Sequence, residues 1–422
     1  MKFFTIPEVV QRHVNFKSIL EWLFFLCPVS LAINKNADDY VAALLFAVSC
    51  LFLLSRLKTS LSAIRSARPL WVLALTMPLL LVTVQGVALQ PPLAFRDFDD
   101  YSRFFFCIPI YFAAISLRLD TRKFLWGCLF FTLYSVPLMI YQMLVVNAGR
   151  APPPNGFLGI IPHTSFAIIL SLASLQLATT GRGFIRTRLL PGIALLSALV
   201  MPLLTQTRSG FLLLIALGLL VWLLQPQRQL KILAGIGAAT LAIIVLITTS
   251  HHFWGRSDNA LAEIRNYATA TAPTQLTSAT TRIELWRAAG IMALTHPLIG
   301  VGNHHFRDVL GEMKAHRLTP EALEIYSHPH NDFLKMASEG GLLGVFAFVL
   351  LLGVPLVYGG RAYQRTRGIG DPAWMVIVLA SGVLIAGIVD VVFIWRPTIM
   401  FYGMSMSLLL ASLDNGSRQE PA

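Results

Sequence analysis

Long apolar blocks separated by short polar turns form the dominant pattern along this chain. Blocks of about 20 apolar residues are long enough to cross the ~30 Å hydrocarbon core of a bilayer as helices. The pattern therefore predicts an all-α, polytopic membrane protein with about 12 transmembrane helices. We place these helices near residues 18–34, 40–56, 69–89, 103–119, 124–147, 157–179, 187–206, 209–225, 231–250, 333–358, 373–394 and 397–413.

A segment of about 80 residues, 250–332, interrupts this alternation between the ninth and tenth predicted helices. Long loops inside compact folds usually carry function. The chain thus divides into a first group of nine helices (1–249), the long loop (250–332), and the last three helices with a short polar tail (333–422).

Two stretches of the long loop, 258–270 and 281–294, alternate polar and apolar residues at a helical period. The second stretch places Leu285 and Ala289 on one face, which favours an amphipathic helix lying on the membrane surface. The glycine-rich residues 300–303 then predict a flexible turn.

Composition excludes a soluble protein: 55% of the residues are hydrophobic and only 13% are charged, about half the charge of a typical soluble domain. The four cysteines all lie inside apolar blocks, so we expect neither a disulfide framework nor a cysteine metal site. No small-residue cleavage site follows the first apolar block. We therefore expect this block to be retained as a helix rather than cleaved as a signal peptide.

Lysines and arginines are distributed unequally between the two sides of the predicted bundle. With the N-terminus placed inside, the inner segments hold 19 of these residues and the short outer connections hold 6. By the positive-inside rule both termini are cytoplasmic, and the long loop lies on the outer side. The net charge of +12 therefore reflects topology, and anionic membrane lipids are the expected partners rather than nucleic acid.

Eight of the ten histidines lie in or beside the long loop, and the sharpest local motif is Ser327-His328-Pro329-His330-Asn331-Asp332. Pro329 favours an extended approach to the next predicted helix, which Asn331 or Asp332 can cap. His330 then lies at the positive end of that helix, whose dipole disfavours the imidazolium form. A neutral histidine can accept a proton as a general base; the alternative is a structural histidine at the membrane interface.

His328 and His330 also resemble the beginning of a metal site. No cysteine or acidic triad close in the sequence completes it, so we expect no metal. Of the other histidines, His163 lies near the outer end of the sixth predicted helix.

Several arginines fall on the outer side. Arg208 lies in a turn so short, residues 205–210, that its guanidinium must be at or just below the membrane surface. It could snorkel to water or bind phosphate oxygens bidentately. Asp390, near the outer end of the eleventh predicted helix, could orient an arginine or stand alone as an interfacial acid. Arg103, Arg282, Arg287 and Arg396 are likewise outer-side arginines, near predicted helix ends or in the long loop.

Four motifs follow one another within about residues 150–350. They are Thr-Arg-Ser-Gly at 207–210, Thr-Arg-Ile-Glu-Leu-Trp at 281–286, His-Pro-Leu-Ile-Gly-Val-Gly at 296–302, and His-Asn-Asp-Phe-Leu with Glu-Gly-Gly-Leu-Leu-Gly within 330–344. Their order and spacing resemble the O-antigen ligase family, and the many-helix layout extends the resemblance over the whole chain.

This resemblance implies a GT-C-like glycosyltransferase of the bacterial inner membrane with a periplasmic active site. The donor would be undecaprenyl-diphosphate-linked O-antigen and the acceptor a sugar hydroxyl of lipid A–core, with no metal or nucleotide cofactor. By the same likeness His330 is the catalytic histidine, Arg208 and Arg282 bind the diphosphate, and Asp390 matches an acidic residue late in the family pattern. The secondary candidates are Arg287, His328, Asn331, Arg103 and His163.

Other activities fit part of this pattern. O-antigen polymerases and protein O-oligosaccharyltransferases share the superfamily, and the motifs do not separate them from ligases. A lipid or glycan transporter would favour charges at mid-membrane and paired broken helices, and a non-enzymatic scaffold would need no particular outer-side residue. For a transferase, we expect His330, Arg208 and Arg282 to meet at a lipid-accessible hollow on the outer side.

Overall fold

The computed structural model describes residues 6–33, 36–89, 95–145, 159–177, 183–185, 189–205, 207–224, 278–320, 323–366 and 371–416. Within these ranges the regular structure is helical, without strands. The helices on the N-terminal side of the long loop are α1 (Ile6–Ile33), α2 (Ala37–Ser55), α3 (Leu57–Ser66), α4 (Pro69–Ala88), α5 (Phe95–Leu117), α6 (Arg122–Val145), α7 (Ile160–Ser174), α9 (Leu190–Thr205) and α10 (Arg208–Leu224). Those that follow are α13 (Ser278–Thr295), α14 (Phe306–Ala315), α15 (Asp332–Thr366), α16 (Pro372–Val389) and α17 (Arg396–Gly416).

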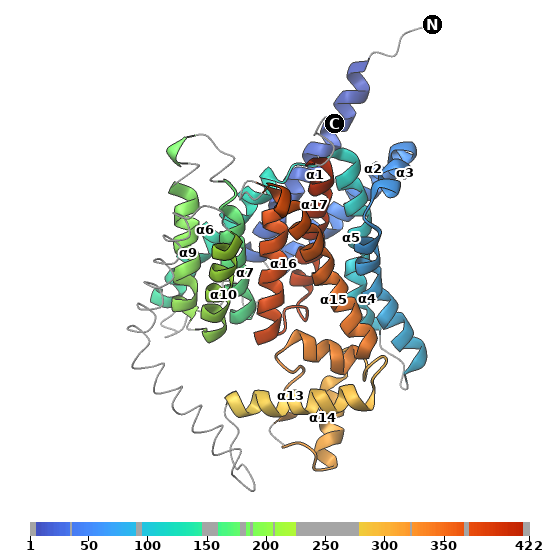
Figure 1. Ribbon diagram of the computed structural model, residues 1–422, viewed down its shortest axis with the longest axis vertical. Coiled ribbons are helices and arrows are strands. Elements are labelled where there is room, and N and C mark those ends of the chain that lie inside the picture. The colour runs from blue at the N-terminus through green and yellow to red at the C-terminus, as the bar shows by residue number, and fades with distance from the viewer. Residues whose placement is uncertain are drawn as a thin grey trace.

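Most of these helices form one bundle, and α13 and α14 lie across one of its ends (Figure 1). The first turns of α1, the end of α17 and the basic helix α3 lie at the opposite end (Figure 1). These helix ends belong to the side that the charge distribution along the sequence assigns to the cytoplasm, and that assignment stays a prediction.

Six of the described helices are long and apolar enough to span a membrane: α1 from Asn15, α2, α4, α6, α15 and α16. Three shorter apolar helices, α7, α9 and α10, also coincide with predicted spans. The prediction of a polytopic helical membrane protein is confirmed. The total of twelve spans and the GT-C-like arrangement stay predictions, and the span predicted at 231–250 lies outside the described residues.

The last helix, α17, occupies the centre of the bundle. Every residue from 397 to 411 is buried, and Ser407 accepts a hydrogen bond from the indole Nε1 of Trp71 in α4 at 3.3 Å. A helix that is covered by protein on all sides tolerates small polar residues such as Ser405 and Ser407, which pack closely against neighbouring helices. This explains why α17 coincides with a predicted span although it is less apolar than α4 and α16.

The helix α15 is broken at Gly341, where φ is 58°. Figure 1 shows the chain bending between a first part, residues 332–340, and a long second part that enters the bundle. The sequence predicts one uninterrupted span here, so the structure corrects this prediction. Gly340 and Gly344, on either side of the break, lie against α4, since a Cβ on either would lie 3.1 or 3.5 Å from Leu81.

The break forms because the glycine-rich residues 296–302 dock on it through main-chain atoms. Val301 and Gly302 donate backbone hydrogen bonds to Ser338 and Glu339 at 2.9 and 3.1 Å. In return Leu342 and Leu343 donate to Pro297 and Leu298 at 2.8 and 3.1 Å. The predicted flexible turn at 300–303 is thus held in place, and all four of its residues are buried.

A small second core lies outside the main bundle, between α13 and α14. Leu285, Ala289 and Met292 of α13 are fully or almost fully buried there, against Phe306, Leu310 and other apolar residues. The predicted helix at 281–294 is confirmed, but its apolar face packs on protein rather than on the membrane surface. The helix predicted at 258–270 lies outside the described residues.

Candidate active site

The His330 turn, residues 327–331, connects the small core to the first part of α15. His330 has φ of 53°, a left-handed conformation that is uncommon for a residue with a side chain. Strained backbone of this kind persists only where the surroundings fix it, and it concentrates at functional sites. Two contacts fix it here: Trp286 Nε1 of α13 donates to the Pro329 carbonyl at 3.0 Å, and His330 N donates to His328 Nδ1 at 3.3 Å.

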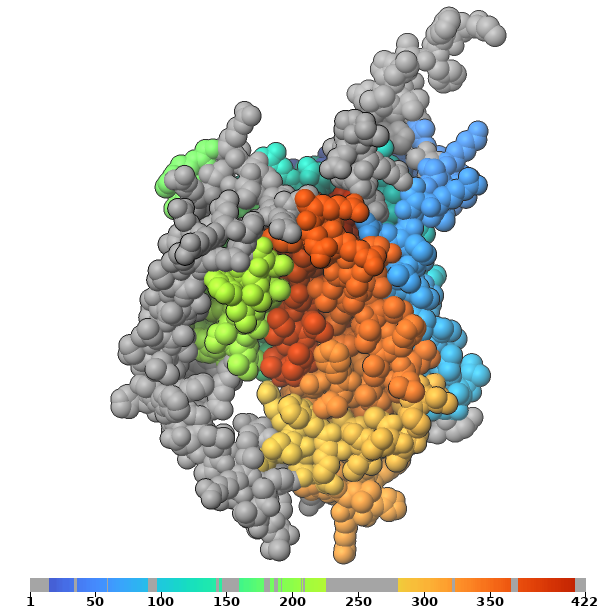
Figure 2. Space-filling model, viewed as in Figure 1, coloured from blue at the N-terminus to red at the C-terminus, as the bar shows by residue number. Residues whose placement is uncertain are grey.

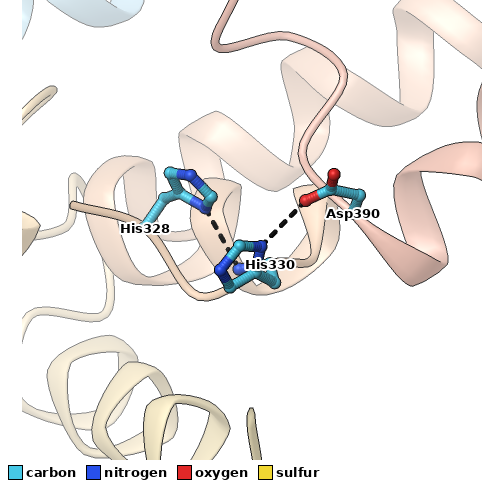
Figure 3. A group of neighbouring side chains, drawn as sticks. All are labelled: His328, His330 and Asp390. Carbon is cyan, nitrogen blue, oxygen red and sulfur yellow. Dashed lines mark hydrogen bonds and ion pairs between the residues drawn. The ribbon is translucent and has the colours of Figure 1, made fainter. Parts of the chain in front are cut away.

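The imidazole of His330 is paired with the carboxylate of Asp390. The distance from Nδ1 to Asp390 Oδ1 is 2.9 Å, and Figure 3 shows the His330 ring between His328 and Asp390. Asp390 is the residue that ends α16, and it is only 8% exposed. Because a carboxylate only accepts, Nδ1 carries the proton in the neutral ring. The other nitrogen, Nε2, has no hydrogen-bond partner among the described residues, so its lone pair is free to accept a proton.

Asn331 joins the same turn to α15 and α16. Its Oδ1 accepts the backbone N–H of Leu334 at 3.0 Å, as an N-cap does. Its Nδ2 donates to the carbonyl of Ile388, two residues before Asp390, at 2.8 Å. The capping role predicted for Asn331 is therefore present, together with a cross-link between the two helices.

His328 packs edge-on against His330, with ring centroids 4.5 Å apart. Burial, with a smaller contribution from His330, lowers the pKa of His328 to about 4, so the ring is neutral near pH 7 and its Nδ1 can accept the His330 N–H. Among the described residues, His328, His330 and Asp390 also form the one group close enough to hold a metal ion, with ligand atoms within 4.8 Å of one another. The sequence did not show this acidic member, because it lies 60 residues away along the chain.

Arg282 and Trp286 are one helical turn apart on α13, so they share a face. Trp286 bonds directly to the His330 turn, which brings this face of α13 to the candidate base. Arg282 is half-buried and forms no hydrogen bond or ion pair with the described residues. Arg287 differs, because Glu284 and the Leu318 carbonyl accept its hydrogen bonds at 2.8 and 2.6 Å. Arg287 therefore has partners in the described structure, whereas Arg282 has none among the described residues.

Arg208 is the first residue of α10, and the position of its side chain lies outside the described atoms. The threonines around it fix where its backbone lies: Thr205 Oγ1 is 3.0 Å from both Thr207 Oγ1 and Thr164 Oγ1 of α7. The start of α7 contacts the segment after Asp390, since a Cβ on Gly159 would lie 3.6 Å from the Trp395 ring. The beginning of α10 therefore lies close to the start of α7, which in turn lies near Trp395 in the segment after Asp390. In the space-filling view α13 lies across one end of the bundle (Figure 2).

Arg103 and Arg396 belong to a separate polar cluster. Arg103 pairs with Asp39 and Asp99, and Arg396 pairs with Asp99 and Asp100 at 3.2 and 3.1 Å. Asp100, which precedes the predicted span at 103–119, also lies 2.8 Å from His304 Nε2.

The balance of charges at this cluster fixes the ionisation of Asp100. Burial alone would raise the pKa of Asp100, but the hydrogen bonds and charges of His304 and Arg396 together lower it. These residues join α2, α5 and α17 to the loop between α13 and α14.

His163 is not part of the His330 site in the described structure. It is buried in α7, 2% exposed, with its ring 5.5 Å from that of Phe131.

Sequence reasoning missed two features of the site. It did not pair Asp390 with His330, because nothing in the sequence between them indicates that the end of α16 returns to the start of α15. It also passed over Trp286, whose position four residues after Arg282 was the available signal.

Comparison with known proteins adds one finding. Residues 193–349 match the family model described as O-antigen ligase. A search of curated proteins found none that matches this chain.

Proposed function

Residues 193–349 carry the O-antigen ligase family domain, and from this premise we propose that the chain is an O-antigen ligase of the bacterial inner membrane. It transfers O-antigen polysaccharide from undecaprenyl diphosphate to a sugar hydroxyl of lipid A–core, on the periplasmic side. The reaction needs no ATP, because the sugar–diphosphate bond supplies the free energy, and by the resemblance it uses no metal. Both termini are cytoplasmic.

In the proposed reaction, the acceptor hydroxyl attacks the anomeric carbon of the donor from the side opposite the diphosphate. A new glycosidic C–O bond forms while the anomeric carbon–diphosphate bond breaks, so the configuration at that carbon inverts. His330 Nε2 takes the hydroxyl proton as general base. Arg208 and Arg282 bind the departing undecaprenyl diphosphate, whose negative charge grows as the bond breaks.

One observation supports this role best: the 2.9 Å contact between His330 Nδ1 and Asp390. It holds the ring in the tautomer that presents an unprotonated Nε2, and the carboxylate stabilises the imidazolium that forms when the proton is taken. The guanidinium of Arg282, which has no hydrogen-bond or ion-pair partner among the described residues, lies on the helix that bonds to the same turn. A histidine with a free Nε2 and an arginine on the helix that bonds to its turn support a transfer from a diphosphate donor rather than a scaffold.

The experiment is a purified assay with a defined lipid-linked glycan and lipid A–core, in which the joined product is measured. The His330→Ala protein should lose about 10²–10⁴-fold in rate with an unchanged melting temperature. A near-normal rate for this variant would exclude the base role.

The same assay separates the ligase from the polymerase. Wild-type protein given donor alone should form no product if it is a ligase, whereas a polymerase lengthens the glycan without lipid A–core. A protein acceptor in place of lipid A–core tests the oligosaccharyltransferase alternative, and glycan-lipid movement without a new bond would indicate a transporter.

A further inference from the structure

The Asp390 turn, residues 390–395, is tied to the start of α15 on both sides of Asp390. Before it, the Ile388 carbonyl accepts the Nδ2 hydrogen bond of Asn331 at 2.8 Å. After it, the backbone N–H groups of Val392 and Phe393 donate to Asp332 Oδ2 and Oδ1 at 2.9 and 3.3 Å. Asn331 and Asp332, which follow His330 in the sequence, therefore bind the backbone on the two sides of Asp390.

Asp332 has no exposed surface, and α16 approaches it at a glycine. A Cβ on Gly387 would lie 2.8 Å from Asp332 Oδ2 and 3.2 Å from its Cβ, so a larger residue at 387 would push the two helices apart. Phe393 is fixed from the other side by the rings of Phe104 and Tyr402, at centroid distances of 5.6 and 5.3 Å. The Asp390 turn therefore has little freedom to move while Asp332 holds it.

An acidic residue in the first turn of a helix ordinarily serves that helix, by accepting its free N–H groups or by favouring its dipole. In α15 the cap is Asn331, which accepts the Leu334 N–H. Both oxygens of Asp332 are instead directed to Val392 and Phe393, outside its own helix. Its contacts thus serve the placement of the Asp390 turn.

We infer that Asp332 is a positioning residue, which holds Asp390 within hydrogen-bond distance of His330 by binding the backbone of the Asp390 turn. This inference rests on the proposed function, since it assigns to Asp332 the geometry of the proposed base. Asp332 itself does not contact the reacting atoms. Without it, the Asp390 turn would lose two hydrogen bonds that are shielded from water.

The test compares Asp332→Asn and Asp332→Ala in the purified transfer assay. The asparagine keeps one carbonyl oxygen and can hold one of the two N–H groups, whereas alanine holds neither. A displacement of about 1 Å in a catalytic group can cost about 10²-fold in rate. We expect kcat to fall about 10²-fold in Asp332→Ala and less in Asp332→Asn, with KM for the donor nearly unchanged.

The matched control is Asp308→Asn, which removes an exposed acidic residue from the first turn of α14 and should leave kcat unchanged. A double-mutant cycle then identifies the cause. If Asp332 acts through Asp390, adding Asp332→Asn to Asp390→Ala should lower the rate by less than about 3-fold.

The possible outcomes are distinct. Full activity of Asp332→Asn and Asp332→Ala, or a loss that repeats unchanged in the Asp390→Ala background, overturns the positioning role even when the base assignment holds. Near-normal activity of His330→Ala overturns the proposed function instead. If Asp332→Ala does not fold, the Asp332→Asn cycle still decides the question. A raised KM with unchanged kcat would place Asp332 in substrate binding and would also overturn the inference.

Discussion

Replacing Asp390 is the most direct test of the candidate site, because its carboxylate is the group that determines which nitrogen of His330 is free. The contact is short, 2.9 Å, and Asp390 is mostly buried. In Asp390→Ala the ring loses both its orientation and the charge that stabilises its protonated form. In Asp390→Asn the side-chain amide can donate to Nδ1, which moves the ring proton to Nε2 and removes the acceptor.

The size of the effect follows from electrostatics. Two unit charges about 4 Å apart attract by about 4 kcal/mol at an effective dielectric constant near 20, which corresponds to about 10³-fold in rate. The imidazolium charge is only partly developed in the transition state. We therefore expect kcat to fall about 10²- to 10³-fold in Asp390→Ala, and at least as far in Asp390→Asn.

The assay is the transfer of a defined lipid-linked glycan to lipid A–core by protein in nanodiscs, with both substrates saturating. The melting temperature of each variant shows whether it is folded. Folded Asp390→Ala and Asp390→Asn proteins whose kcat lies within about 3-fold of the wild type would refute the reasoning, because the hydrogen bond would then have no catalytic consequence.

Three further predictions concern other parts of the structure. Arg282→Ala should raise KM for the donor about 10-fold or more, since hydrogen bonds to charged groups contribute about 1.5–3 kcal/mol. The control is Arg287→Ala, because Glu284 already binds the Arg287 guanidinium. Equal effects of the two substitutions on KM would contradict the assignment. Gly300→Ala should lower the free energy of unfolding by more than about 2 kcal/mol, because its Cβ would lie 2.2 Å from the Glu339 backbone carbon. Gly311→Ala in α14, where a Cβ meets nothing within 4 Å, should leave the free energy of unfolding unchanged. Thermal unfolding of both variants measures the difference. In the folded protein the pKa of His328 is about 4, below its ordinary value of 6.5. The unfolded chain therefore binds the proton first, and stability is lost as pH falls from about 6.5 towards 4. Over this range the melting temperature of His328→Asn should fall less than that of the wild type, and parallel curves of melting temperature against pH would contradict the prediction.

The sequence predicted the parts of the fold that depend on local pattern. Apolar blocks of membrane-spanning length appear as helices in the structure, and the period at 281–294 appears as α13. The interruption at Gly341 was not predicted, because residues 342–358 continue the apolar pattern and the signal lies in residues 296–302, which dock on the break. The sequence also did not predict that the apolar face of α13 packs on Phe306 and Leu310, because α14 was not recognised.

The site was predictable only to the level of residue types. His330 and Asn331 are neighbours in the sequence, and a proline before them already indicates a constrained turn. Asp390 lies 60 residues further along the chain. Its pairing with His330 depends on how α16 packs against α15, and the spacing of residues in the sequence does not predict that packing. The roles of Trp286 and Asp332 could not be predicted because each residue already has a local explanation. Trp286 reads as an aromatic residue on a helix face and Asp332 as an acid that caps a helix. Only their long-range contacts in the structure show that they bind the His330 turn and the Asp390 turn.

The central position of α17 has a consequence for biosynthesis. The helix that completes the interior of the bundle, α17, is made after every other described helix. The helices α5, α16 and α2, which pack against α17, therefore cannot reach their final contacts until α17 has been inserted. Until then some polar groups of the earlier helices lack their final partners in the membrane. The Trp71 indole, whose N–H donates to Ser407 of α17, is one of them. A chain that stops before residue 396 would therefore lack the helix around which the others assemble, and quality-control proteases should remove it even though the His330 turn is intact.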